Sequence, residues 1–138
     1  MWKGIDVSDN QGAINWAQIP KNVDFAILRS VRRSGKADHQ FATNLEGCRK
    51  RNIPMSVYKY TYAATPEAAR QEAQQVVALL QSYGLTGTMV WWDVEDKDVL
   101  RPLGAAKLTD CYNVGSVSAG STDCRMWRNH YAEHDSAV

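Results

Sequence analysis

The chain has 138 residues, of which 44% are hydrophobic and 22% are charged, and its formal net charge is +1. These values fit one globular domain with enough apolar side chains for a core. Because the charges are mixed and nearly balanced, we expect neither nucleic acid nor a membrane as the partner. No run of about 18 apolar residues is present, so no spanning helix is expected, and the chain begins without a visible signal peptide.

Strand-like and helix-like segments alternate along most of the chain. The apolar run from Asp24 to Arg29 is typical of a strand covered on both faces. Asp38 is a plausible N-cap for the helix that follows it. Thr65 and Pro66 are favourable at a helix start, and Gly84 ends that helix. The sequence predicts strands at residues 3–7, 24–29, 53–60 and 88–95, and helices at residues 38–51, 66–83 and from 105 onward.

This alternation predicts an α/β fold with a parallel sheet and a functional site at the carboxyl ends of the strands. The pattern ends near Asn113, so we divide the chain into a domain at residues 1–114 and a divergent, poorly patterned tail at residues 115–138. His130 and His134 lie four residues apart in that tail, but no helical pattern surrounds them, and we predict no metal site there.

Three cysteines, Cys48, Cys111 and Cys124, form neither a CxxC pair nor an even set. A disulfide scaffold and a cysteine-based metal site are therefore not expected. We interpret all three as free thiols.

The strongest chemical signal is the pair Asp93 and Glu95, two residues apart on a predicted strand and therefore on one face of it. Asp6 ends the first predicted strand, so a parallel sheet brings it to the same rim. Hydrolysis of a glycosidic bond needs one protonated and one ionised carboxyl group. A neighbouring charge and nearby aromatic rings raise the pKa of a carboxyl, and we expect this raised pKa at Glu95. Solvated acids at strand ends are the alternative interpretation.

Aromatic side chains accompany these acids. Tyr58, Tyr60 and Tyr62 alternate along the third predicted strand and share a face, and such rings suit the mixed apolar and polar surface of a sugar. A half-buried sheet face is the alternative. Of Trp91 and Trp92, one must face the sheet interior and the other the helices.

Arg29 ends the second predicted strand, where it would pair with one of the rim carboxylates or serve as a purely structural ion pair.

Five segments, taken together and in order, resemble glycoside hydrolase family 25. They are Gly4–Gly12, Ile14–Trp16, Phe25–Arg29, Tyr58–Ala63 and Trp92–Glu95. The resemblance implies an irregular, TIM-like β/α barrel that cleaves the β-1,4 bond between N-acetylmuramic acid and N-acetylglucosamine in peptidoglycan, without a metal or organic cofactor. Peptidoglycan glycan strands are then the expected partner, and the cell wall is the place of action.

The resemblance also implies roles for individual residues. Glu95 matches the family's general acid, while Asp93 and Asp6 match its active-site carboxylates. Tyr62 resembles an aromatic residue near the substrate. We take Tyr60, Trp92 and Arg29 as further substrate-binding candidates, of which Arg29 matches by strand position only.

A complete eight-stranded barrel needs about 200 residues or more, whereas four strands are recognisable before Asn113. We therefore interpret the chain as truncated or frameshifted, and we expect the hydrolase activity to be weak or absent. Alternatives are a non-catalytic remnant that binds peptidoglycan and a chitinase-type barrel, against which the DxSxxQG opening argues. Residues i and i+2 of a strand lie roughly 6.6 Å apart at Cα, which fits both inverting and retaining mechanisms.

Overall fold

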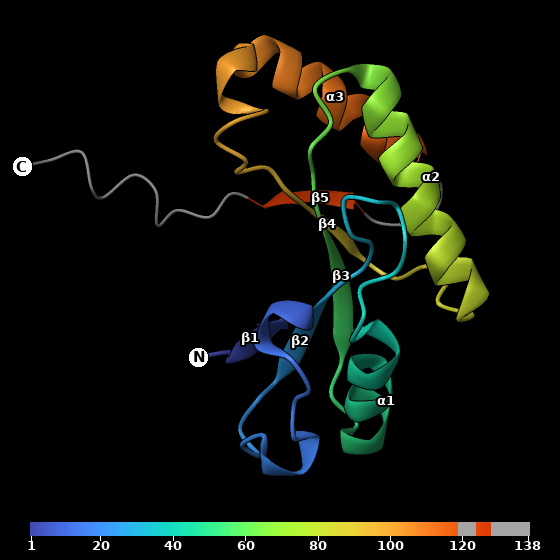
Figure 1. Cartoon of the computed structure of the whole chain (residues 1–138). Helices are drawn as coiled ribbons and strands as arrows, with labels where there is room; N and C mark the ends of the chain where they lie inside the picture. The colour runs from blue at the N-terminus through green and yellow to red at the C-terminus, as the bar shows by residue number, and fades with distance from the viewer. Residues whose placement is uncertain (119–123, 128–138) are drawn as a thin grey trace, which may run out of the picture.

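Figure 1 shows the computed structural model of the chain, which describes residues 1–118 and 124–127, with side chains described through residue 113. The strands are β1 (Gly4–Val7), β2 (Phe25–Arg29), β3 (Met55–Tyr60), β4 (Val90–Asp93) and β5 (Cys124–Trp127). The α-helices are α1 (Phe41–Arg51), α2 (Pro66–Ser82) and α3 (Gly104–Ser118). Short 3-10 helices are η1 (Asp9–Gln11), η2 (Trp16–Gln18) and η3 (Arg101–Leu103).

All five strands are parallel and lie in the order β1-β2-β3-β4-β5, which is also their order in the sequence. Each strand after β2 is reached through a helix that covers the sheet, as expected for a β/α barrel wall. The predicted α/β class and parallel sheet are therefore confirmed. The fifth strand was not predicted, because Cys124–Trp127 has no apolar pattern and is placed by backbone pairing with Val90–Asp93.

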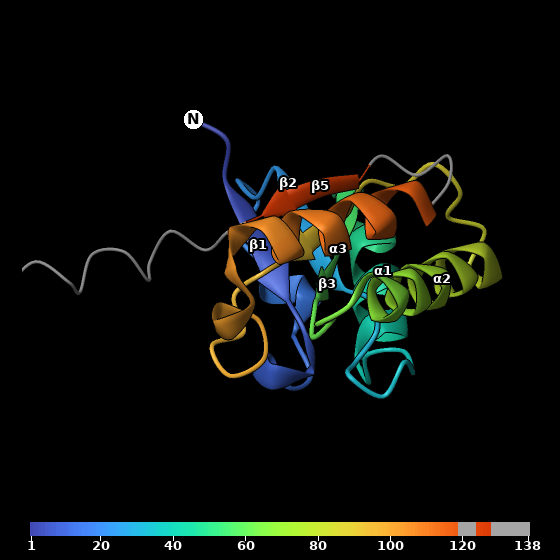
Figure 2. The same cartoon turned by 90° about the horizontal axis from the view of Figure 1, so that it is seen from above.

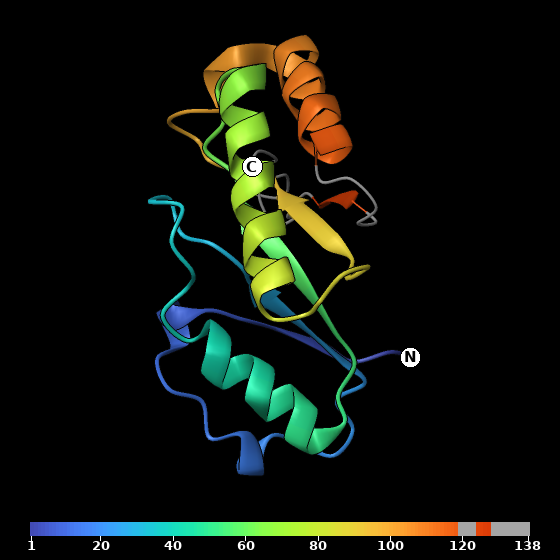
Figure 3. The ribbon, with the colours of Figure 1, turned by 90° about the vertical axis from the view of Figure 1, so that its right-hand side faces the viewer.

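The main core lies between the sheet and helices α1 and α2, which cover one of its faces (Figures 1 and 3). Alternate strand residues point into this layer and are almost completely buried. They meet two helix surfaces whose apolar residues recur every three or four positions. The strands contribute Val7, Ala26, Leu28, Val57 and Val90, and the helices contribute Phe41, Leu45, Cys48, Val76 and Leu80.

A second, smaller core joins α2 to α3 through Ala63, Ala69 and Cys111. The two helices lie side by side, as Figures 2 and 3 show. This contact anchors α3 beside the carboxyl ends of β3 and β4.

The strand residues between these core residues point to the opposite face of the sheet. Phe25 and Ile27 of β2 and Trp91 of β4 are half-buried there and line shallow hollows near the amino ends of the strands. Polar residues occupy this same face farther along the strands. The candidate site residues therefore lie on the same face of the sheet as these apolar side chains.

Element boundaries match the sequence pattern where a cap fixes them. Thr65 accepts a hydrogen bond from the Ala68 N–H at 3.2 Å and starts α2 at Pro66, as predicted. Helix α1 begins three residues later than predicted, because the Asp38 carboxylate accepts hydrogen bonds from the Gln40 and Asp9 N–H groups ahead of the helix. Strand β4 ends earlier than predicted.

Candidate active site

Asp93 is the last residue of β4 and the most buried acid of the predicted site, with 6% of its surface exposed. Burial, and then the charges of Glu95 and Asp6, raise the pKa of Asp93 to about 7. Its Oδ1 has no hydrogen-bond partner among the residues whose side chains are described. Its surroundings therefore favour the neutral form of this carboxyl.

The two other predicted acids lie close enough to act on Asp93. Asp6 is exposed on β1, and its charge also acts on Tyr58. Glu95 is exposed in the loop after β4, and its charge also acts on Tyr60. The structure thus brings Asp6, Asp93 and Glu95 to one end of the sheet, although they are separated by almost ninety positions in the chain.

The structure shows a raised pKa at Asp93, the partner of Glu95 in the predicted pair. The reason is where β4 ends: Asp93 is still within the sheet and loses its water, while Glu95 lies two residues beyond it and is exposed. The raised pKa expected at Glu95 stays a prediction.

The three predicted tyrosines lie at different depths. Tyr58 is 9% exposed, and burial raises its pKa to about 12. Tyr60 is half-buried and pairs in register with Asp93; burial and the nearby charges of Asp96 and Glu95 raise its pKa to about 12. Its hydroxyl donates to Asp96 Oδ2 at 3.4 Å. The Tyr62 ring lies 5.0 Å from that of Tyr60, and we call these two rings the tyrosine platform.

A buried ion pair positions the platform. Lys59 is 1% exposed and points toward α2, where its Nζ lies 3.4 Å from Glu72 Oε1. Glu72 also accepts hydrogen bonds from the Thr61 hydroxyl and, at 3.0 Å, from the Tyr62 N–H. Glu72 therefore fixes the turn after β3. The sequence carries a signal for this ion pair: a lysine lies in a buried strand, and Glu72 lies on the same α2 face as Ala69 and Val76.

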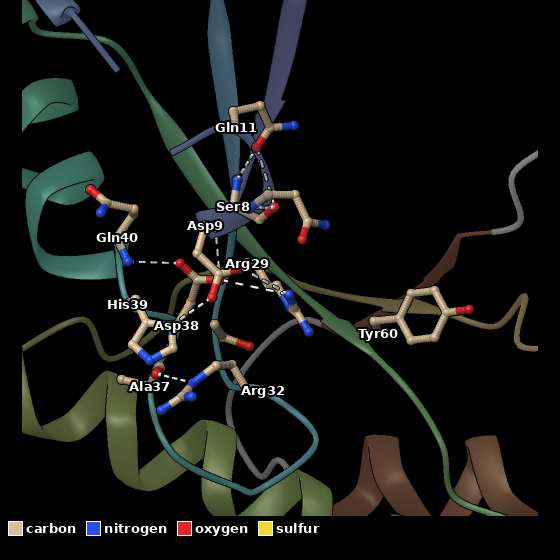
Figure 4. A network of polar contacts seen from close by, with 12 residues as sticks. Ser8, Asp9, Gln11, Arg29, Arg32, Ala37, Asp38, His39, Gln40 and Tyr60 are labelled. Atoms are coloured by element: carbon tan, nitrogen blue, oxygen red, sulfur yellow. Dashed lines mark hydrogen bonds and ion pairs between the residues drawn. The ribbon is translucent and has the colours of Figure 1, made fainter. Parts of the chain in front are cut away.

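Arg29 lies at the end of β2, in a polar network that Figure 4 shows. The sequence predicts a pair with a rim carboxylate or a structural pair, and the structure has the second kind. Arg29 Nη1 lies 3.2 Å from Asp9 Oδ1 and 3.8 Å from Asp38 Oδ2. His39 Nδ1 lies 2.8 Å from Asp9 Oδ2, and this hydrogen bond is the largest of the effects that lower the pKa of Asp9. Burial raises the pKa of Asp38.

The loop that follows Asp6 is fixed by its own sequence. Ser8 caps the η1 helix by accepting from the Asn10 N–H, and the Gln11 side chain accepts from the Ser8 N–H at 2.7 Å (Figure 4). This reciprocal capping explains the spacing of Ser8 and Gln11. Together with Arg29 and Asp9 it fixes the chain immediately after the first site acid.

The two tryptophans occupy opposite faces of β4. Trp92 is 4% exposed and lines an apolar cavity of about 20 Å³ with Val94, Leu100 and Cys111, on the helix side. Trp91 lies on the same face as Asp93, half-buried, and its indole N–H donates to Ser56 Oγ at 3.1 Å. Trp92 is therefore not brought together with the acids.

In the described part of the chain, no three His, Cys, Asp or Glu residues are grouped to hold a metal ion. The candidates His130 and His134 lie outside the described residues. Cys48 and Cys111 are free thiols, as predicted, and both are buried, whereas the side chain of Cys124 is not described. No helix among the described residues has the length and apolar character needed to span a membrane.

The chain is similar to one protein family and to several solved structures. Residues 5–136 match the sequence model of Glycosyl hydrolases family 25. The modular autolysin LytC from Streptococcus pneumoniae, solved with a synthetic peptidoglycan ligand, is 25% identical with a TM-score of 0.79; the match covers 92% of this chain and 32% of that chain. The endolysin ply40 catalytic domain from bacteriophage P40 of Listeria monocytogenes is 18% identical with a TM-score of 0.74, covering 93% and 64%.

The bacterial lysozyme from Streptomyces coelicolor is 16% identical with a TM-score of 0.71, and the match covers 92% of this chain and 62% of that chain. A search of curated protein sequences gave no significant match. The chain thus spans about a third of the autolysin and less than two thirds of the endolysin domain and the lysozyme.

Proposed function

Because this chain belongs to glycosyl hydrolase family 25, we propose that it acts on peptidoglycan as a muramidase, cleaving the β-1,4 bond between N-acetylmuramic acid and N-acetylglucosamine. The observation that carries the proposal is the placement of Asp93, which is buried at the end of β4 between the charges of Glu95 and Asp6. Glycosidic hydrolysis uses such a mixture of protonated and ionised carboxyl groups.

We assign the proton to the Asp93–Glu95 pair as a unit. In the free site, burial keeps the proton on Asp93. Glu95 is the exposed member, which a glycan can reach, and it occupies the position that the family resemblance assigns to the proton donor. A glycan that covers the site excludes water from both acids, and Glu95 is then the group that reaches the leaving oxygen. Asp6 then supplies the negative charge that stabilises the developing positive charge on the sugar.

The tyrosine platform supports the substrate class. Tyr60 and Tyr62 offer two half-buried rings beside the acids, and aromatic rings pack against the apolar face of a pyranose while their hydroxyls meet its polar edge. The autolysin with a bound peptidoglycan ligand supports the same partner. Trp92 packs on the helix side and is left out of the proposed glycan site.

We expect slow turnover. The described strands form one wall of the site, and Glu95 lies in a loop rather than in β4. A proton donor on a less constrained segment loses part of the benefit of fixed geometry. The same observation favours the second candidate, a module that holds the glycan on the tyrosine platform without cleaving it.

Two measurements on one preparation separate these candidates. The chain is added to purified cell walls, and the loss of turbidity and the release of reducing ends are followed together with the amount of protein that pellets with the walls. A muramidase releases reducing ends, and Glu95→Gln lowers the rate by about 100-fold or more, as loss of an acid catalyst does. The exposed Asp98→Asn is the matched control, with unchanged rate expected. Pelleting without reducing ends identifies the binding module, and a chain that neither pellets nor releases reducing ends contradicts both.

A further inference from the structure

The tyrosine platform is electrically asymmetric. On the Tyr60 side lie the negative charges of Asp96, Glu95 and Asp93, which act on its hydroxyl. On the Tyr62 side, the Arg33 guanidinium carbon lies 4.4 Å from the ring centroid. A sugar on the platform therefore has the catalytic acids at one end and a cation at the other.

Arg33 is held by a tight turn between β2 and α1. The Arg32 N–H donates to Lys36 O at 2.8 Å, the Gly35 N–H donates to Arg32 O at 3.0 Å, and an antiparallel bridge joins Val31 to Ala37 below them. The Arg32 side chain closes the turn with a bond from its Nε to Ala37 O at 3.0 Å. The backbone that presents Arg33 is thus fixed before any ligand arrives, which lowers the entropic cost of binding.

The same turn is seated on α2. Gly35 has φ of +80°, and a Cβ built there would lie 2.5 Å from the Gln75 side chain of α2. The positive φ favours glycine, and a side chain at this position would displace the flexible end of Gln75. The turn therefore lies against α2.

Arg33 differs from the other cations around the platform in having no acidic partner. Lys59, whose Nζ lies 5.4 Å from the Tyr62 centroid, is neutralised by Glu72, and Arg29 is paired with Asp9 and Asp38. Within the residues whose side chains are described, no carboxylate lies at ion-pair distance from Arg33, which is exposed. Its charge is therefore available to an anion.

We propose that Arg33 and Tyr62 form a subsite for a carboxylate carried by the glycan, so that the site prefers acidic over neutral saccharides. This inference rests on the proposed function and names a residue that determines its specificity. The ring of Tyr62 keeps the guanidinium plane in place, and that plane pairs with a carboxylate through two parallel N–H···O bonds. Peptidoglycan has two sources of such a group: the lactyl carboxylate of a muramic acid without peptide, and the carboxylates of an attached peptide.

The test measures binding, by titration of tryptophan fluorescence, to three probes at low salt. These are a peptide-free muramic acid tetrasaccharide, the same glycan with peptides attached, and neutral chitotetraose. Arg33→Gln weakens binding of a carboxylate-bearing probe about threefold to fivefold, in the range of an exposed ion pair, and leaves chitotetraose unchanged. Arg33→Lys retains part of the preference, and a few hundred millimolar salt removes most of it. The probe that responds identifies the source of the carboxylate.

Arg49→Gln is the matched control, since Arg49 is exposed at the end of α1, away from the carboxyl ends of the strands, and binding is expected to be unaffected. Equal weakening of all three probes by Arg33→Gln, or no difference between Arg33→Gln and Arg49→Gln, overturns the subsite. A wild-type chain that binds both peptidoglycan probes but shows neither effect contradicts this inference alone. A wild-type chain that binds none of the probes contradicts the proposed function, and the subsite with it.

Discussion

Replacing Asp93 with asparagine should change the pH dependence of folding in a calculable way. The folded-state pKa of Asp93 is raised from 3.8 to about 7, so between these values the folded chain holds a proton that the unfolded chain has released. Stability from this group is therefore fully present below pH 4 and declines as the pH rises through 7. A shift of about three units corresponds to about 4 kcal/mol, as an order of magnitude. The asparagine side chain does not ionise, so its contribution to stability does not change over this pH range.

The assay is urea unfolding followed by tryptophan fluorescence at pH 4, 5.5 and 8. Asp93→Asn and the wild type should have similar free energies of unfolding at pH 4, and the variant should be more stable at pH 8, by up to about 4 kcal/mol. Asp98→Asn, at an exposed position of the following loop, should follow the wild type at every pH. If Asp93→Asn and the wild type keep a constant difference from pH 4 to pH 8, the argument that Asp93 is buried in protonated form is refuted.

Four further substitutions test the framework around the site in the same unfolding assay. Arg29→Met leaves the buried Asp38 without its cation and should cost about 3 kcal/mol at pH 7, with a smaller loss at pH 4, where Asp38 can take up a proton. Glu72→Ala should destabilise the chain by about 2 kcal/mol more than Lys59→Met, because it leaves a buried ammonium and two hydrogen-bond donors without their acceptor. Equal effects of the two substitutions would contradict this network. Leu28→Ala, at a fully buried core position, should cost about 2–5 kcal/mol at all pH values.

The parts of the fold that could be predicted are those encoded by local pattern. The apolar run from Phe25 to Leu28 predicts a strand covered on both faces, and Thr65 with Pro66 predicts the start of α2. Strand β5 escaped prediction because its position is fixed by hydrogen bonds to β4 rather than by a pattern of its own. Backbone pairing carries no sequence signature.

Within the candidate site, the meeting of the three acids at one end of the sheet could be predicted, because each lies at or just beyond the end of a recognisable strand and parallel strands end at one rim. The ion pairs around the site could not be predicted from the sequence. Arg29 meets Asp9 and Asp38, which belong to two different loops, and loop conformation decides such pairs. The sequence could not show that Asp93 is the buried member of the Asp93–Glu95 pair. Burial depends on where β4 ends, and strand ends are the least well defined feature of a sequence pattern.

The contrast among the buried charged residues gives the best reason to place chemistry at Asp93. Of the charged residues that are buried, Asp38 has Arg29 and Lys59 has Glu72, so each is compensated by an opposite charge. Asp93, in the same described part of the chain, has instead two like charges beside it and a carboxyl oxygen without a hydrogen bond. Such an arrangement lowers stability, and a fold gains nothing structural from it. A buried acid kept among other acids, beside two half-buried tyrosines, supports the proposal that proton transfer to a sugar takes place here.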